Sequence, residues 1–167
     1  MKQLTDREKA YRAWKDMCRR CEEQPAYTDC TVCDEWQDFE GFVDWYIGNC
    51  PGVNGFDLDK DILSVEEKIY SPATCAFVPR AINLLINVEK TKAGSFPIGV
   101  SINGDKFKAQ IRVKSKMVYL GTFATIEDAS AAYRAGKENH VKAMAYEFRH
   151  MITDKVFNAL MKWSVNS

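Results

Sequence analysis

The chain has 167 residues, 46% hydrophobic and 12% aromatic, which is enough to bury one or two modest cores and excludes a disordered tail. No apolar run approaches the roughly 18 residues of a membrane span, and the N-terminal stretch MKQLTDREKAYR lacks the apolar region of a signal peptide. We therefore expect a soluble, cytoplasmic protein with no membrane partner.

The formal net charge is zero, but the two halves of the chain differ sharply. Residues 1–88 contain 10 Lys and Arg against 16 Asp and Glu, a net charge of −6, whereas residues 89–167 contain 13 against 7, a net charge of +6. Between Lys90 and Tyr119 there are seven basic side chains and a single acid, Asp105. Such asymmetry indicates a polyanionic partner for the C-terminal part of the chain.

Hydrophobic spacing predicts two helices in the N-terminal half. Apolar side chains recur three and four residues apart in residues 6–21 and again in residues 36–49. The stretch EQPAYTDCTVC between them is expected to be a loop. Residues 56–63, FDLDKDIL, alternate as in a strand, and a second extended piece is followed by a helix that begins after Pro79.

The C-terminal half carries the signals of a small antiparallel sheet. Three candidate strands cover residues 98–101, 106–113 and 117–123. Asn103-Gly104 is a strong hairpin signal between the first two, because both residues tolerate a positive φ.

A helix is expected to follow this sheet. The run Thr125-Ile-Glu-Asp128 fits a capping pattern at a helix start. One face of that helix would carry Ala129, Ala132, Tyr133 and Gly136, whose mostly small side chains let it lie close to the sheet. A last amphipathic segment, DKVFNALMKW, ends the pattern.

These elements predict an α+β fold in four parts. Residues 1–90 form an N-terminal unit of helices with a ββα arrangement, and residues 91–97, TKAGSFP, form a polar linker. Residues 98–145 form a three-stranded antiparallel sheet packed on one helix, and residues 146–167 a helical C-terminal extension.

In the expected strand at residues 106–113, polar or charged residues alternate with apolar residues. Phe107, Ala109, Ile111 and Val113 share one parity and would pack against the helix, while the other parity is polar and cationic. A cationic row that repeats about every 7 Å suits the phosphates of one nucleic-acid strand. The alternative is an ordinary solvated sheet face, against which the scarcity of carboxylates argues.

The stretch PIGVSINGDKFKAQIRVKSKMVYLGTFATIEDASAAYRAGKENH resembles the APETALA/ethylene-response-factor DNA-binding domain over about 45 residues. That resemblance implies a sheet that enters the major groove of double-stranded DNA. Ser101 departs from the family, which usually has Arg after its Gly-Val pair, so base specificity does not carry over. The DNA-contact candidates are Lys106, Lys108, Gln110, Arg112, Lys114, Lys116 and Tyr119.

The upstream half is similar to phage-encoded relatives of HNH-type homing endonucleases. The similarity lies in YRAWKDMCRRC, CTVCDEWQDFEGFVDW, LDKDI and IYSPATCAFVPRAIN. It implies a ββα unit that binds Mg²⁺ or Mn²⁺, with Asp59 and Asn83 at metal-ligand positions and a His as general base. Lys60 occupies the His position, and a lysine of ordinary pKa is protonated at neutral pH and cannot accept a proton from water.

The cysteines allow two interpretations. The pairs Cys18-x-x-Cys21 and Cys30-x-x-Cys33 have the spacing of a structural Zn²⁺ site, and the related proteins retain counterparts that make Cys75 an alternative ligand. The other interpretation is buried thiols that pack as small hydrophobic groups. A disulfide framework is not expected in the cytoplasm.

Together these features predict a phage protein that binds double-stranded DNA in the cytoplasm of the bacterial host. Its HNH-like unit either cleaves DNA with a divalent metal or has lost that activity. A noncatalytic regulator or counter-defence protein, which binds a host protein through its acidic half, is the alternative. RNA is less favoured, because the sheet lacks the paired aromatic residues of RNA-reading sheets.

Overall fold

The computed structural model describes residues 4–64, 66–87, 95–113 and 116–165, and its fold is α+β as expected. The chain forms two compact units. Unit 1 consists of Met1–Asn83 and His150–Ala159, and unit 2 of Leu84–Arg149 and Leu160–Ser167. Among the described residues, no helix has both the length and the apolar character needed to cross a membrane.

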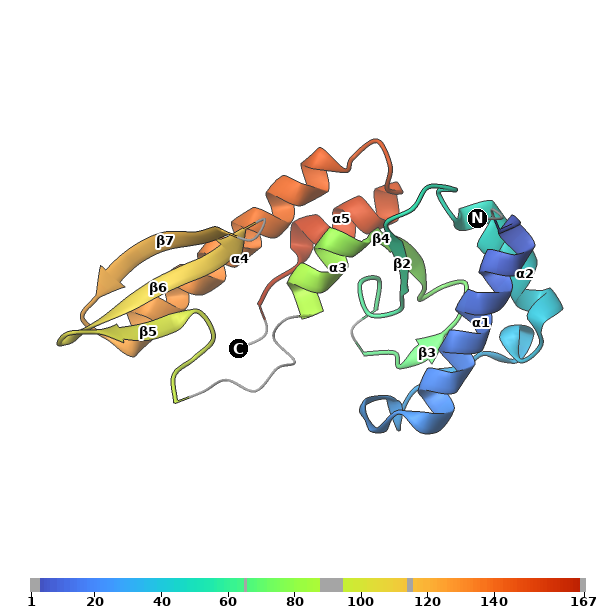
Figure 1. The fold of residues 1–167 in the computed structure, drawn as a ribbon, viewed down its shortest axis with the longest axis horizontal. Helices are drawn as coiled ribbons and strands as arrows, with labels where there is room; N and C mark the ends of the chain where they lie inside the picture. Colours follow the sequence, from blue (N-terminus) through green and yellow to red (C-terminus); the bar gives the residue numbers. More distant parts are fainter. Residues whose placement is uncertain (1–3, 65, 88–94, 114–115, 166–167) are drawn as a thin grey trace. The chain divides into compact units, whose positions relative to one another are not determined.

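Unit 1 begins with the two expected helices, α1 (Asp6–Glu23) and α2 (Phe39–Asn49), which pack against each other (Figure 1). Thr5 caps α1 and Asp38 caps α2, each accepting a backbone N–H of the first turn. The expected loop between the helices contains a 3₁₀ turn at Pro25–Tyr27, the two-residue strand β1 (Thr31–Val32) and a second 3₁₀ turn at Asp34–Trp36.

Two small sheets complete unit 1. β1 pairs in parallel with β3 (Ile69–Tyr70), and β2 (Phe56–Asp59) pairs antiparallel with β4 (Ala76–Pro79). α3 (Arg80–Asn87) follows β4 directly, so the paired strands β2 and β4 and this helix give the expected ββα arrangement, although β3 lies between the two strands in the sequence. The core beneath these elements is aromatic, and the Trp36 and Phe42 rings meet edge to face at 5.0 Å.

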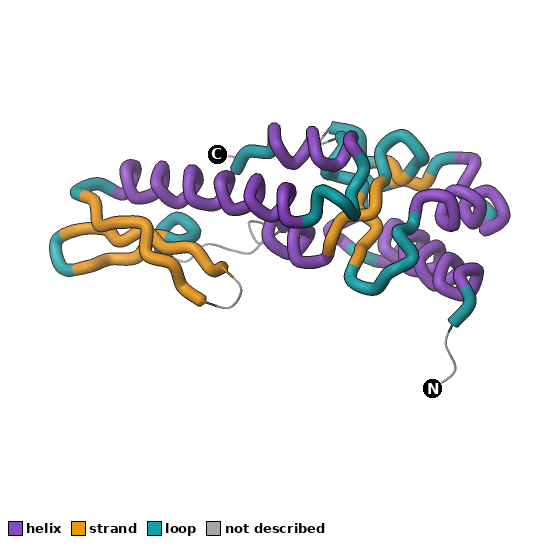
Figure 2. The backbone as a smooth tube through the Cα atoms, turned by 90° about the horizontal axis from the view of Figure 1, so that it is seen from above, coloured by secondary structure: helices purple, strands orange, loops and turns teal. Residues whose placement is uncertain are grey.

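Unit 2 contains the expected three-stranded antiparallel sheet, in the order β5 (Val100–Asn103), β6 (Lys106–Val113) and β7 (Lys116–Phe123). The expected hairpin is present, but its two turn residues are Gly104, with φ 67°, and Asp105, because Asn103 still belongs to β5 and pairs with Lys106. α4 (Ile126–Glu147) starts at the cap Thr125, whose side chain accepts the Asp128 N–H, and runs along one face of the sheet (Figure 2). The C-terminal helix, α5 (Asp154–Lys162), belongs mostly to unit 1.

Small residues bring α4 close to the sheet, as expected. Ala129 is fully buried with Ala109, and Ala132 packs beside them. A Cβ atom built on Gly136 would lie only 2.8 Å from Leu120 Cδ1. A larger side chain at Gly136 would therefore push β7 away from the helix.

Candidate nucleic-acid interface

The sheet of unit 2 has two chemically different faces. Cross-strand partners share a face, so the register places Ser101 and Thr122 beside Lys108, and Tyr119 beside Gln110. We call the side opposite α4 the open face. Its residues are Ser101, Asn103, Lys106, Lys108, Gln110, Arg112, Met117, Tyr119 and Thr122.

The open face carries unneutralised positive charge. Lys106 and Arg112 are exposed and Lys108 is half-buried. Among the described residues, no carboxylate forms an ion pair with any of these three side chains. The expected cationic row is therefore present on β6, on the face away from the helix.

A bulge in β7 decides which side chains join this row. The register shifts between Ala109 and Gln110, so that Ala109 faces Gly121 but Gln110 faces Tyr119, and Leu120 is the additional residue. Leu120 packs on the helix side, and Gly121 takes φ 144°. Without the extra residue Tyr119 would share the parity of Gly121 and point toward α4.

Two hydrogen bonds fix the polar side chains beside Gln110. The hydroxyl oxygens of Tyr119 and Thr122 lie 2.8 Å apart, and Asn103 Nδ2 donates to Thr122 Oγ1 at 3.4 Å. The Tyr119 ring is 62% exposed and Met117 is 50% exposed. The open face thus presents cations together with an amide, an aromatic ring and a thioether.

Not every predicted contact residue belongs to this face. Lys116 pairs with Val113 and so shares the parity of the helix-facing residues, while Lys114 lies outside the described residues. The sequence interpretation missed the contributions of Asn103, Met117 and Thr122. The hairpin register signalled Asn103, which lies opposite Lys106, but Met117 and Thr122 could be placed only with knowledge of the bulge.

In unit 1, the predicted nuclease residues occupy the ββα elements but are engaged in local contacts. Asp59 is buried, and its Oδ1 accepts the backbone N–H groups of Asp61 (2.9 Å) and Ile62 (2.8 Å), which ends strand β2. Asn83 Nδ2 donates to Asp57 Oδ2 at 3.4 Å. Asp57 also accepts two hydrogen bonds from the Arg80 guanidinium at 2.9 and 3.0 Å.

Lys60 is held as a buried cation. It is 5% exposed, forms an ion pair with Asp61, and places its ammonium 5.8 Å from the Tyr27 ring centre and 5.9 Å from that of Tyr70. Burial alone would lower its pKa, but the hydrogen bond and charge of Asp61, with a contribution from Cys30, raise the pKa above the ordinary value. Lys60 is therefore protonated and cannot act as a general base.

The cysteines take part in the packing of unit 1. All six are free thiols, and burial raises the pKa of Cys18 and Cys21 and raises that of Cys75 to about 12. Within the described part of the chain, no three or more His, Cys, Asp or Glu side chains form a group that could hold a metal ion. The zinc site stays a prediction, and its ligands would be Cys18, Cys21, Cys30, Cys33 or Cys75.

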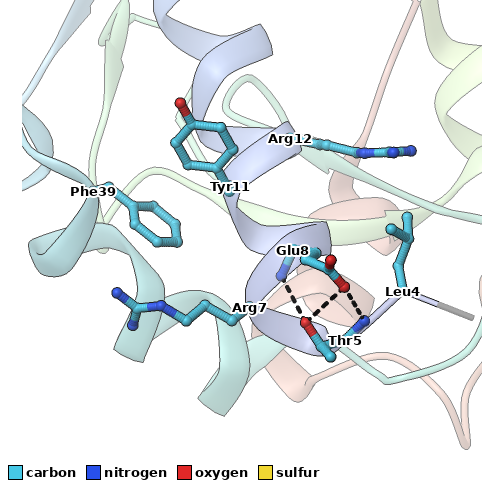
Figure 3. Close-up of a pocket in the computed structure, with 7 residues that line it drawn as sticks. All are labelled: Leu4, Thr5, Arg7, Glu8, Tyr11, Arg12 and Phe39. Carbon is cyan, nitrogen blue, oxygen red and sulfur yellow. Dashed lines mark hydrogen bonds between the residues drawn. The ribbon is translucent and has the colours of Figure 1, made fainter.

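A pocket of about 510 Å³ lies at the first turns of α1 and the start of α2, in unit 1 (Figure 3). Three of its polar side chains, Thr5, Arg7 and Glu8, are engaged in the local structure. Glu8 and Thr5 form a capping box, and Arg7 pairs with Glu40 while its guanidinium lies 5.0 Å from the centre of the Phe39 ring. These groups stabilise a helix start and form no catalytic arrangement.

No protein-family model, curated protein or solved structure matches this chain. The candidate functional regions are the open face of unit 2 and the ββα elements of unit 1.

Proposed function

We propose that this protein binds double-stranded DNA through the open face of unit 2. The observation that carries the proposal is the cationic row of Lys106, Lys108 and Arg112 on the sheet face opposite α4, with no carboxylate partner among the described residues. Phosphate neutralisation by such side chains supplies much of the affinity of DNA-binding proteins.

The dimensions of the sheet suit a duplex groove. Neighbouring strands lie about 4.8 Å apart, so β5 and β7 are separated by about 10 Å, compared with a major groove about 12 Å wide. Successive open-face residues of β6 repeat every 6.5 to 7 Å or so along the strand. The resemblance to the APETALA/ethylene-response-factor domain, whose sheet enters the major groove, supports the same mode.

The test is a titration of fluorescent duplex DNA at several salt concentrations. We expect the full chain to bind the duplex. The magnitude of the slope of log affinity against log salt concentration should be smaller by about one unit in Lys108→Ala, and likewise in Arg112→Ala, than in the parent. Lys116→Ala is the matched control, because it removes the same charge from the other face and should change the slope less. Absence of duplex binding by the parent at low salt would overturn the proposal.

For unit 1 we infer an HNH-like ββα unit that lacks the general base. The antiparallel pair of β2 and β4 followed by α3, and the two strand carboxylates Asp57 and Asp59, support the likeness. The raised pKa of Lys60 opposes catalysis, because cleavage requires a group that accepts a proton from water. Noncatalytic DNA binding, as in a regulator, is the function that these observations favour.

A further inference from the structure

Gln110 lies at the centre of the open face, between Lys108 and Arg112 on β6 and opposite Tyr119 on β7. Its backbone is fixed, because its N–H donates to the Gly99 carbonyl at 2.9 Å. Its side-chain amide forms no hydrogen bond with any described residue. The amide is therefore available to an external partner.

The amide differs chemically from the other open-face groups. The lysines and Arg112 can only donate hydrogen bonds. The hydroxyl groups of Tyr119 and Thr122 bond to each other, and Asn103 donates to Thr122. Ser101 Oγ is buried and has no hydrogen-bond partner among the described residues. Asn103 keeps its Oδ1 and one N–H, but its Nδ2 already donates to Thr122, whereas no described residue engages either end of the Gln110 amide.

In the major groove this combination matches one base. Adenine offers an N7 acceptor beside an N6 donor, whereas guanine offers two acceptors and cytosine a donor. A glutamine amide can form two hydrogen bonds with adenine at once. The flanking cations would contact the phosphates of the duplex. Such contacts fix the position of the protein along the DNA but do not distinguish one base from another.

We propose that Gln110 is a specificity-determining residue that recognises an adenine edge in the major groove of the bound duplex. This proposal rests on the DNA-binding function proposed above and adds a base preference to it. The Tyr119–Thr122 pair borders the amide and limits the positions that a base pair can take beside it.

The test begins with selection of preferred duplexes from a random pool by the full chain. We expect one position to be adenine, with a loss of about 5- to 150-fold when another base replaces it. The adenine is then replaced by 7-deazaadenine, which removes the N7 acceptor and leaves Watson–Crick pairing intact. The parent should lose affinity with this analogue, and Gln110→Ala should bind both duplexes equally.

Two further measurements keep the outcomes distinct. Gln110→Glu retains the shape but only accepts hydrogen bonds, so selection with this variant should move the preference from adenine to cytosine. Lys116→Ala, which changes the other face of the sheet, should keep the adenine preference of the parent. The proposal is overturned if Gln110→Ala keeps the adenine preference. It is also overturned if the parent binds duplexes but shows no adenine preference. A parent that binds no duplex overturns both this proposal and the proposed function.

Discussion

The side-chain oxygens of Tyr119 and Thr122 lie 2.8 Å apart, although the two residues are three positions apart on a single strand. Regular alternation would place residues of this spacing on opposite faces of a sheet. The bulge at Leu120 reverses the parity, and it brings the Tyr119 ring to the cationic face while Leu120 joins the core. A one-residue irregularity thus sets the composition of the candidate interface.

The junction between β5 and α4 provides a test of the fold. Gly99 has φ 77°, and a Cβ atom added there would lie 2.0 Å from Tyr133 Cδ2 and 2.8 Å from the Gln110 carbonyl oxygen. We expect Gly99→Ala to lower the free energy of unfolding by about 2–5 kcal/mol, as the sum of backbone strain and crowding. Urea denaturation followed by circular dichroism measures this change.

The control for this variant is Gly104→Ala. Gly104 has a similar positive φ of 67° but open space around the position of a Cβ atom, so only the backbone term of about 1–2 kcal/mol remains. Equal losses in the two variants would contradict the close approach of Tyr133 to the strand.

Lys60 is expected to stabilise unit 1. Lys60→Ala removes two ring contacts and the ion pair with Asp61, and we expect a loss of about 2–4 kcal/mol in the free energy of unfolding. Lys68→Ala, which removes an exposed ion pair with Asp29, should cost less. A smaller effect at Lys60 than at Lys68 would argue against the buried position of the ammonium.

The pH dependence of this difference follows from the raised pKa of Lys60. A folded-state pKa above the ordinary 10.5 means that the stabilisation is complete below pH 10.5 and is lost as the pH rises through the folded value. The difference between parent and Lys60→Ala should therefore be constant from about pH 6 to 9 and decrease in more alkaline solution. Denaturation series at several pH values measure it.

A plasmid nicking assay with Mg²⁺ or Mn²⁺ tests the inference that unit 1 lacks a general base. We expect no metal-dependent cleavage by the parent at neutral pH, and the same result for Asp59→Ala. Cleavage by the parent that disappears in Asp59→Ala would identify unit 1 as a nuclease with a base other than Lys60.

Metal analysis of protein purified under reducing conditions distinguishes zinc binding from packed thiols. Zinc binds thiolates, and burial raises the pKa of Cys18, Cys21 and Cys75, which favours the protonated thiols. We expect a zinc content near zero. A stoichiometry near one, together with release of zinc when thiols are modified, would establish a structural site instead.

Local sequence signals were sufficient for most of unit 2. The alternation in β6 identified both faces of the strand, the Asn103-Gly104 pair located a hairpin, and Thr125 marked the start of α4. These signals worked because each depends on neighbouring residues. The bulge had only one weak local signal, the glycine Gly121 inside a strand, because MVYLGTF contains apolar residues at both parities and either register satisfies its pattern.

Unit 1 was harder to predict, since its decisive contacts are distant in sequence. The strand expected over residues 56–63 ends at Asp59. The Asp59 carboxylate accepts hydrogen bonds from the backbone N–H groups of Asp61 and Ile62, and the chain leaves the strand there. A lysine in such a polar run is normally solvated. Lys60 is buried because Tyr27 and Tyr70 reach it from two other segments, which no local pattern indicates.

The two faces of the unit 2 sheet use different residues, and this separation affects which substitutions the sheet can tolerate. Packing against α4 depends on residues such as Ala109, Leu120 and Gly136, none of which belongs to the open face. Substitutions at Gln110 or Met117 would thus change the chemistry of the proposed interface at little cost to folding. Such an arrangement makes the sheet a natural scaffold for retargeting, in which new recognition properties are selected on an unchanged framework.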